Sequence, residues 1–422
     1  MSRRPPTATV PPRPPATAPH RGRPSPPAPD GLAAPPAAAP PRGRPSPPAP
    51  DGLAAPPHAA AVSPPPLRRV LICSATALDE DGAIVSVGDE ALVDALADAL
   101  RHRYPGVDVR RTLKGADVPG RVPVRPVRAL AGAIRASDLV IAGGGTMFQE
   151  DVDTRGIAGL LRYLIVVATT ARGCGVSFAI TAVGAENLRH RASRAAARYV
   201  LRRARTVSAR DAATAALLRE VGGRDVALAA DTMFLPGVRL PDPPAPDGSV
   251  AVSLRADAPD SLIDGLAEWL AADGRPVTLV PMDRRAHSDG AALDALASKL
   301  AQPCHVVPRT ATWQEVYRAV AAADVCVGMR LHFTVFAALA GRPTVVVGSA
   351  PKTRSFAADL DLRLLEPRAE AAWIGAVMDT ATPPDPIRLA TLRTRAENAL
   401  AALDEAVGAA RPSAAAASSE LP

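Results

Sequence analysis

From Leu67 onward, short apolar runs typical of buried strands alternate with longer segments that have the apolar spacing of helices. Alternation of this kind favours parallel sheets covered by helices on both faces. A proline-rich stretch, residues 236–248, interrupts the rhythm once, and the alternation then begins again. The sequence therefore predicts an α/β protein with two Rossmann-like domains that face a cleft, and such clefts usually bind small molecules.

The alternation also assigns bounds to the elements and domains. Strands are expected at residues 69–74, 107–111, 139–142, 176–181, 206–207, 226–229, 250–254, 277–280, 305–307, 325–327 and 344–347. The clearest helices are expected at residues 90–103, 126–135, 157–172, 189–203, 212–221, 331–340 and 387–409. The predicted domains are an N-terminal domain at 67–236, a linker at 237–248, a C-terminal domain at 249–385 and a terminal helix at 386–411.

Residues 1–66 differ in composition: they are rich in Pro, Ala and Arg, and RGRPSPPAPDGLAAPP occurs in them twice. Such a segment has too little bulky apolar surface to offset its ordering entropy, so we expect a disordered tail. The Ala/Ser-rich end, residues 412–422, should be loose as well. Seven arginines and two aspartates give residues 1–66 a charge of +5, which leaves about +2 of the chain's +7 for the rest.

Composition argues against several classes of function. Aromatic residues make up only 3% of the chain, and most of its excess positive charge lies in the tail, so nucleic-acid binding is not expected. No apolar run approaches the ~18 residues that cross a bilayer, and none follows the N-terminal arginines as in a signal peptide. We therefore expect a cytoplasmic protein without a transmembrane segment. The four cysteines include no Cys-x-x-Cys pair and are expected to be mostly buried, reduced thiols.

The sequence Gly328-Met329-Arg330-Leu331-His332 connects an apolar strand to an apolar helix. A cation and an imidazole thus lie at a helix N-terminus after a strand's carboxyl end, where α/β proteins bind ligands and helix amides favour anions. Alternatively, His332 belongs to the apolar stripe of Val335 and Phe336 and is a packed core residue. Arg330 would then also be buried without a partner. Burying an unpaired guanidinium costs several kcal/mol of free energy, so an anionic ligand is favoured.

Four further clusters lie where a strand leads into a helix: GDEA at 88–91, GGGTMFQ at 143–149, SARD at 208–211 and APK at 350–352. The glycine cluster either lets backbone amides approach a ligand or forms a tight βα turn, and it lacks the dinucleotide and P-loop fingerprints. Asp89 could simply cap its helix. Arg210 could bind an anion or be a solvated residue at a helix start. The acidic pairs are isolated and no His cluster occurs, so no metal site is predicted.

In combination and order, these blocks resemble the polysaccharide pyruvyl transferase family, from about Val70 to Leu360. GMRLHFTVFAALAGRP is similar to the family's Gly-x-Arg-Leu-His block, and GDEA, GGG-x-x-Phe-Gln and SARDAATAALLREVG are similar to further blocks. Asp231 and Lys352 fall where the family often has Asp and Lys. The resemblance implies a GT-B-like fold and transfer of pyruvate from phosphoenolpyruvate to a sugar of a cell-surface glycan or its lipid-linked precursor, as a ketal.

The resemblance also implies roles for single residues. His332 is the expected acid/base, and Arg330 and Arg210, with Lys352 as an auxiliary cation, are expected to bind phosphoenolpyruvate in the C-terminal half of the cleft. Weaker candidates line the cleft: Gly143, Gly144, Gly145, Gln149, Asp89 and Asp231. Phosphoenolpyruvate is the donor substrate, so no cofactor is expected, and the partners are this small molecule and a glycan acceptor. The resemblance leaves open whether the protein contacts a membrane peripherally through a lipid-linked acceptor.

The chain departs from the family pattern in three places. Thr146 replaces a fourth glycine, Glu150-Asp151-Val152 replaces an Asp-Thr/Ser pair, and the tyrosine that often precedes Lys352 is missing. The first two changes lie on the N-terminal, acceptor side of the cleft, so they concern the acceptor sugar more than the donor.

Two alternatives remain. A nucleotide-sugar glycosyltransferase of the same architecture would also place a basic residue at this helix start. It would, however, often carry an acidic residue one or two turns after His332, and none is obvious there. A non-catalytic glycan-binding or scaffold protein could use its Pro-rich tail for docking. Retention of both Arg330 and His332 argues against that reading.

Overall fold

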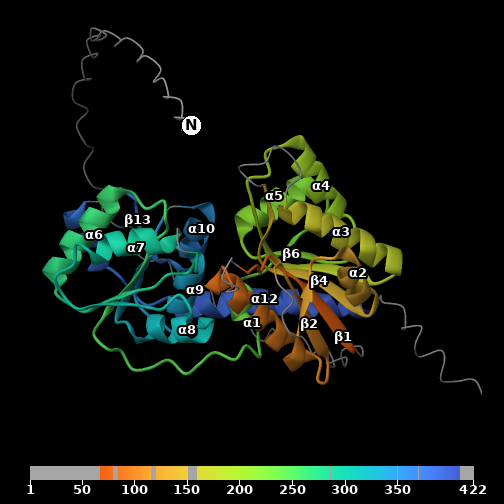
Figure 1. The fold of residues 1–422 in the computed structure, drawn as a ribbon, viewed down its shortest axis with the longest axis horizontal. Helices are drawn as coiled ribbons and strands as arrows, with labels where there is room; N and C mark the ends of the chain where they lie inside the picture. Colours follow the sequence, from red (N-terminus) through yellow and green to blue (C-terminus); the bar gives the residue numbers. More distant parts are fainter. Residues whose placement is uncertain are drawn as a thin grey trace, which may run out of the picture. The chain divides into compact units, whose positions relative to one another are not determined.

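The computed structural model describes residues 67–408 except 79–83, 116–119, 151–158, 286–287, 349 and 369, and all described residues belong to one compact unit. The expected disorder of residues 1–66 and the loose end at 412–422 lie outside the described residues. Within the unit, two parallel sheets form two lobes, which we call the first and the second lobe in chain order (Figure 1).

The sheet of the first lobe has seven parallel strands in the order β3-β2-β1-β4-β5-β6-β7. Their bounds are β1 (Arg69–Cys73), β2 (Asp108–Leu113), β3 (Arg121–Pro123), β4 (Leu139–Gln149), β5 (Ser177–Glu186), β6 (Val207–Ala209) and β7 (Ala227–Leu228). The strand order reverses between β1 and β4, which is the switch point beside which open α/β sheets bind ligands.

The sheet of the second lobe has six strands in the order β10-β9-β8-β11-β12-β13. Their bounds are β8 (Val250–Ser253), β9 (Val277–Leu279), β10 (Cys304–Val306), β11 (Val325–Gly328), β12 (Thr344–Val347) and β13 (Arg363–Leu365). Ser253 pairs with Gly328 at the carboxyl ends of β8 and β11, where this sheet has its own switch point.

Twelve α-helices and a short 3-10 helix connect the described strands. Their bounds are α1 (Val87–Arg103), α2 (Val127–Arg135), α3 (Gly159–Cys174), α4 (Arg191–Leu201), α5 (Ala212–Gly222), η1 (Thr232–Phe234), α6 (Asp260–Asp273), α7 (Asp289–Ala297), α8 (Trp313–Ala322), α9 (Leu331–Leu339), α10 (Pro351–Leu360), α11 (Ala371–Met378) and α12 (Pro386–Gly408). Local signals define several starts: Ser86 caps α1, Asp211 caps α5, and Thr312 forms a capping box with Glu315 at α8.

Successive residues of β1 point to opposite faces, and both faces are apolar, as expected for a parallel sheet buried on both sides. Leu71 packs in a cluster with α2, α3, α4 and α5. Val70 and Ile72 belong to a second cluster, formed with α1 and α12, that continues to Cys326 and Val346 of the other sheet. A third cluster packs the outer helices of the second lobe onto its sheet. The second of these clusters, which includes Val70 and Ile72, is therefore an apolar core that both lobes share.

Polar contacts also join the two lobes. Ser86 forms an antiparallel bridge with Asp283, and the amide of Val87 donates to the carbonyl of Met282 at 3.1 Å. The buried Arg284 donates to Glu90 of α1 at 3.3 Å. The start of α1 is thus held by the loop that follows β9. The terminal helix α12 contacts α10 and also β5 and η1 of the first lobe.

The predicted fold class, two parallel α/β sheets in Rossmann-like lobes, is confirmed. Three details were wrong. β4 continues through the glycine cluster to Gln149, so these glycines do not form a tight βα turn. The short edge strands β3 and β13 were missed. Cys304 is exposed rather than a core thiol. Among the described residues, no helix is long and apolar enough to span a bilayer.

Candidate active site

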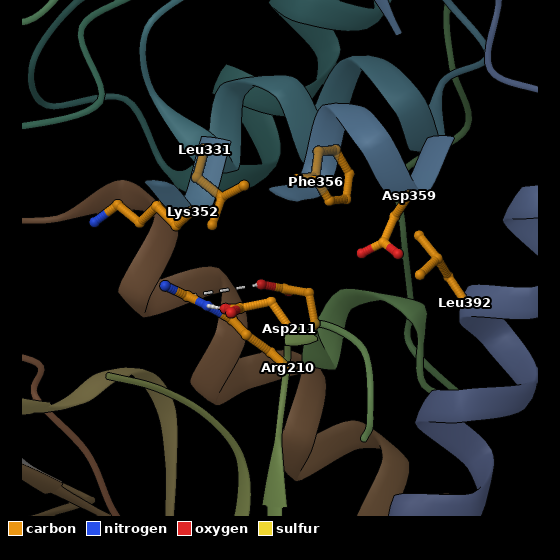
Figure 2. A pocket seen from close by; sticks show the side chains of 8 residues that line it. Arg210, Asp211, Leu331, Lys352, Phe356, Asp359 and Leu392 are labelled. Atoms are coloured by element: carbon orange, nitrogen blue, oxygen red, sulfur yellow. Dashed lines mark ion pairs between the residues drawn. The ribbon is translucent and has the colours of Figure 1, made fainter. Parts of the chain in front are cut away.

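A pocket lies where the carboxyl end of β6 meets the starts of α9 and α10. Side chains of both lobes line it: Arg210, Asp211, Asp231, Leu331, Lys352, Phe356, Asp359 and Leu392. Figure 2 shows Arg210 and Asp211 on one side, with Leu331, Lys352 and Phe356 across from them. The structure thus brings together, from two lobes, residues that are more than a hundred positions apart.

Arg210 is a buried cation with unused hydrogen-bonding capacity. Its side chain is only 4% exposed, and its Nη2 donates to Thr146 Oγ1 at 2.9 Å. Its Nε lies 3.7 Å from Asp211 and its Nη1 lies 4.0 Å from Asp231, but neither nitrogen has a hydrogen-bond partner among the described residues. Gly184 leaves room for this guanidinium, because a Cβ there would lie 2.7 Å from Nη2. Unsatisfied buried donors are costly, so an anionic ligand would stabilise this arrangement.

His332, the second residue of α9, faces the first lobe, because a Cβ on Gly88 of α1 would lie 1.9 Å from its Nδ1. Its side chain is 16% exposed, and its Nε2 lies 3.9 Å from Asp231 Oδ2 without a hydrogen-bond partner. Burial lowers its pKa well below the usual value, and the charges of Arg210, Lys352 and Arg330 lower it further. The imidazole is therefore neutral at neutral pH while the pocket holds no anion.

Two carboxylates of the first lobe, Asp231 and Asp89, interact electrostatically with Arg210. Asp231 is 5% exposed, accepts from the amide of Met233 at 3.1 Å through Oδ1, and leaves Oδ2 without a partner. Burial raises its pKa to about 6, against the opposing effect of Arg210. Burial likewise raises the pKa of Asp89, which Arg210, Lys352 and Arg330 counteract. Asp89 and Asp231 thus belong to the same electrostatic cluster as His332.

Lys352 approaches the site from the start of α10. Its Nζ lies 3.1 Å from Glu186 Oε1, at the carboxyl end of β5 in the first lobe. Burial lowers the pKa of Lys352, and the nearby charge of Arg210 lowers it further. This contact adds a carboxylate to the rim of the pocket.

Arg330 has an internal partner, so the premise that it would be unpaired was wrong. Its Nε donates to both oxygens of the fully buried Asp289 at 3.0 Å, and its Nη2 contacts Asp289 and Ser288. Asp289 also accepts from the amides of Met282 and Asp283. Arg330 therefore fixes the loop that holds the start of α1, and its side chain remains 28% exposed.

The glycines of β4 have a packing role. A Cβ on Gly144 would lie 2.6 Å from Val93, and one on Gly145 would lie 2.8 Å from Asp89, both on α1. The two glycines also have φ values of 77° and 119°, which side chains disfavour. The glycine cluster, which includes Gly143, therefore lets α1 lie close against β4. Gln149, at the end of this strand, is exposed and does not line the pocket.

Sequence reasoning missed some residues of the site and its support. Asp211 belongs to the SARD cluster but was not predicted as a site residue: it caps α5 by accepting from the amide of Thr214 at 2.7 Å and also lines the pocket. Glu186 and Asp289 were missed too, because each acts on a cation far away in the sequence. Among the described residues, no group of three His, Cys, Asp or Glu side chains is arranged to hold a metal ion.

Gly88, at the start of α1, has no room for a side chain. A Cβ there would lie 1.9 Å from Nδ1 of His332. We expect Gly88→Ala to displace this imidazole and to lower the free energy of unfolding by about 1–3 kcal/mol, measured by denaturant titration. The matched control is Gly132→Ala in α2, where nothing lies within 4 Å. It should be neutral or stabilise by about 0.4–1 kcal/mol. Equal effects of the two variants would contradict the close contact.

Comparison with solved structures supports the fold. The UDP-GlcNAc 2-epimerase from Neisseria meningitidis bound to UDP-GlcNAc aligns with a TM-score of 0.50 at 9% identity, covering 80% of this chain and 99% of that one. A 2-epimerase described as putative, from Listeria monocytogenes, aligns at 0.49 and 9%, covering 80% and 96%. AviGT4, a glycosyltransferase involved in avilamycin A biosynthesis, aligns at 0.45 and 15%, covering 82% and 99%. The first likeness shows a GT-B-like fold and nothing more specific.

Sequence comparison identifies the family. No curated protein sequence matches the chain. The family model of polysaccharide pyruvyl transferases, however, matches residues 87–351, from the start of α1 to the start of α10. This range includes Arg210, Asp231 and His332, and it ends one residue before Lys352. The chain belongs to the polysaccharide pyruvyl transferase family.

Proposed function

We propose that this protein transfers pyruvate from phosphoenolpyruvate to a sugar of a cell-surface glycan or of its lipid-linked precursor, forming a cyclic ketal. The family makes the protein a transferase, and the donor and acceptor are our proposal. The observation that carries it is Arg210: a buried guanidinium with two unsatisfied nitrogens in a pocket between the lobes, where the lining residue Asp231 lies 3.9 Å from the neutral imidazole of His332. This combination suits an anionic donor whose reaction needs one proton transfer.

The donor carries a phosphate and a carboxylate, and the site offers cations for both. Arg210 would bind one group through its free Nε and Nη1, since a guanidinium pairs with two oxygens at once. Lys352 would exchange part of its contact with Glu186 for the ligand, and the exposed part of Arg330 faces the same cluster of charges. Each charge-assisted hydrogen bond contributes roughly 1.5–3 kcal/mol.

His332 would handle the proton. Binding a multiply charged anion offsets the cations that now lower the pKa of His332, so the imidazole takes up a proton as the donor binds. The imidazolium would then protonate the donor's methylene carbon, and a sugar hydroxyl would attack the resulting cationic carbon. A second hydroxyl would close the ring as the phosphate leaves. Of the two hydroxyl protons, one replaces the proton that His332 gave, and the other leaves with the phosphate.

Asp231 would support this proton transfer. Its free Oδ2 lies 3.9 Å from Nε2 of His332, so a small movement would allow a hydrogen bond once the imidazole is charged. With a pKa of about 6, Asp231 is largely ionised at neutral pH and can stabilise the imidazolium.

Calorimetric titration of the full chain with phosphoenolpyruvate tests the proposal. We expect saturable binding that UDP and GDP do not compete, with more protons taken up per ligand than inorganic phosphate alone would account for. The opposite pattern, binding of UDP or GDP and none of phosphoenolpyruvate, would favour the nucleotide-sugar alternative. Binding without release of phosphate in the presence of glycan acceptors would favour a non-catalytic glycan-binding protein.

A further inference from the structure

The positive charge of the folded chain is concentrated in one part of the first lobe. Between residues 159 and 228, twelve arginines accompany four acidic residues, a net charge of +8. Because residues 67–422 together carry only about +2, the remainder of that part carries about −6. Charge asymmetry of this size influences which surfaces a protein approaches.

Helix α4 presents much of this charge. Arg191, Arg194, Arg198 and the C-cap residue Arg202 follow each other at intervals of three and four, so they lie on one face of the helix. The opposite face packs into the core of the first lobe. The helix contains no acidic residue, and within the described part of the chain only Arg194 of these four forms an ion pair, with Glu220.

Helix capping accounts for some of these cations, but not for all of them. Arg198 donates to the carbonyl of Val221 at 2.8 Å, and Arg203 donates to the carbonyl of Tyr199 at 3.1 Å. Such contacts satisfy carbonyl groups at helix ends. Arg191, Arg202 and Arg205 differ: their side chains are exposed and form no hydrogen bond or ion pair with any described residue. Arg191 and Arg202 belong to the basic face of α4, and Arg205 lies in the loop that leads from α4 to β6.

The basic face begins close to the active site. The amide of His190, the N-cap residue of α4, donates to Glu150 at 2.6 Å, and Glu150 directly follows the carboxyl end of β4. Helix α5, which packs against α4, begins beside Arg210 and Asp211 of the pocket. Figure 1 shows α3, α4 and α5 together on one side of the first lobe.

We propose that the basic face of α4, together with the loop that leads from α4 to β6, docks on an anionic phospholipid surface. The exposed residues between the arginines are small: Ala192 and Ala195. One face of the Tyr199 ring is closed to a stacking base, because Arg203 lies over it with Cζ 3.3 Å from the ring centroid. Backbone phosphates of nucleic acid are therefore a weaker match than a plane of anionic headgroups. Docking would hold the first lobe, and with it the edge of the active site, at the membrane.

Vesicle co-sedimentation of the full chain tests the proposal. The probes are vesicles of phosphatidylcholine alone and of phosphatidylcholine mixed with phosphatidylglycerol. We expect binding only to the mixed vesicles, and reversal by salt. Each arginine near an anionic surface contributes roughly fivefold to the partition coefficient, so R191S/R202S/R205S should weaken binding by about 100-fold.

The matched control is R135S/R363S/R393S, which removes three exposed arginines that form no ion pair among the described residues and lie outside both α4 and the loop that follows it. It removes the same charge and leaves residues 1–66 unchanged, so any binding by that segment is common to both variants. Equal loss of vesicle binding in the two variants, or no loss in either, overturns the proposal. Loss of DNA binding instead of vesicle binding in R191S/R202S/R205S would assign the face to nucleic acid. Neither readout depends on pyruvyl transfer.

Discussion

Replacing His332 with alanine should lower kcat by roughly 10²–10⁴, the range for loss of a general acid. The expectation rests on position: Nε2 of the imidazole lies 3.9 Å from Asp231, which lines the pocket between the lobes, and has no hydrogen-bond partner among the described residues. Phosphate release from phosphoenolpyruvate in the presence of acceptor measures the effect. Because the cations proposed to bind the donor remain, the affinity for phosphoenolpyruvate should change far less than kcat.

His305 offers a matched control, since it is an exposed histidine on β10 outside the pocket. His305→Ala should leave kcat unchanged. His332→Gln keeps much of the side-chain volume but cannot donate a proton as an imidazolium, so it should be as slow as the alanine variant. A glutamine variant with nearly normal kcat would remove His332 from the proton transfer, even if the alanine variant is inactive.

The architecture followed from the sequence because burial on both faces makes parallel strands apolar, and this pattern is local. The same pattern predicted the wrong end for β4: the apolar run ends at Ala142, but the strand continues to Gln149. The strand continues because β5 pairs with it through Glu186, and because glycine allows α1 to lie against it. Neither cause is visible in residues 139–149 themselves. The edge strands β3 and β13, with three residues each, are too short for a periodic pattern.

The site was predictable where a residue's place depends on its own strand and helix. Arg210, His332 and Lys352 each follow a strand's carboxyl end, and the fold brings such ends together. Their partners were not predictable in the same way. Asp289 pairs with Arg330 from the start of another helix, 41 positions earlier, and Glu186 reaches Lys352 from the other lobe. Such pairs depend on three-dimensional contacts that no spacing in the sequence records.

Because Arg330 pairs with Asp289, a substitution of Arg330 would not test donor binding alone. Arg330→Ala would leave the buried Asp289 without its cation and disturb the loop that holds α1, so lost activity would not by itself assign a role in binding. Arg210 is the better probe of donor binding, because two of its nitrogens have no partner among the described residues.

Replacing Arg210 with lysine should weaken phosphoenolpyruvate binding by roughly 10–100-fold, because an ammonium keeps the charge but cannot pair with two oxygens at once. Arg210→Ala should cost more, about 10²–10³-fold, since the charge is lost as well. Calorimetric titration measures both. Arg275→Ala is the control, because Arg275 is paired with Asp273 at the amino-terminal end of β9, remote from the pocket. Equal affinity of the lysine variant and the wild type would mean that Arg210 acts only as a charge.

Stability distinguishes a binding defect from a folding defect in the alanine variant. Arg210 opposes the burial that raises the pKa of Asp231, so Arg210→Ala should raise this pKa further above about 6. A raised carboxyl pKa means that the folded state holds a proton that the unfolded state has released, so stability falls as pH rises toward the folded pKa. In the variant this loss extends to higher pH than in the wild type. The deficit in unfolding free energy of Arg210→Ala relative to the wild type should therefore grow as pH rises above about 6. Arg210→Ala/Asp231→Asn should lose the part of this growth that Asp231 causes, while the part from Asp89, whose pKa Arg210 also holds down, remains. If the double variant is stable across this range and still binds phosphoenolpyruvate as weakly as Arg210→Ala, the affinity loss belongs to the missing guanidinium and not to a damaged fold.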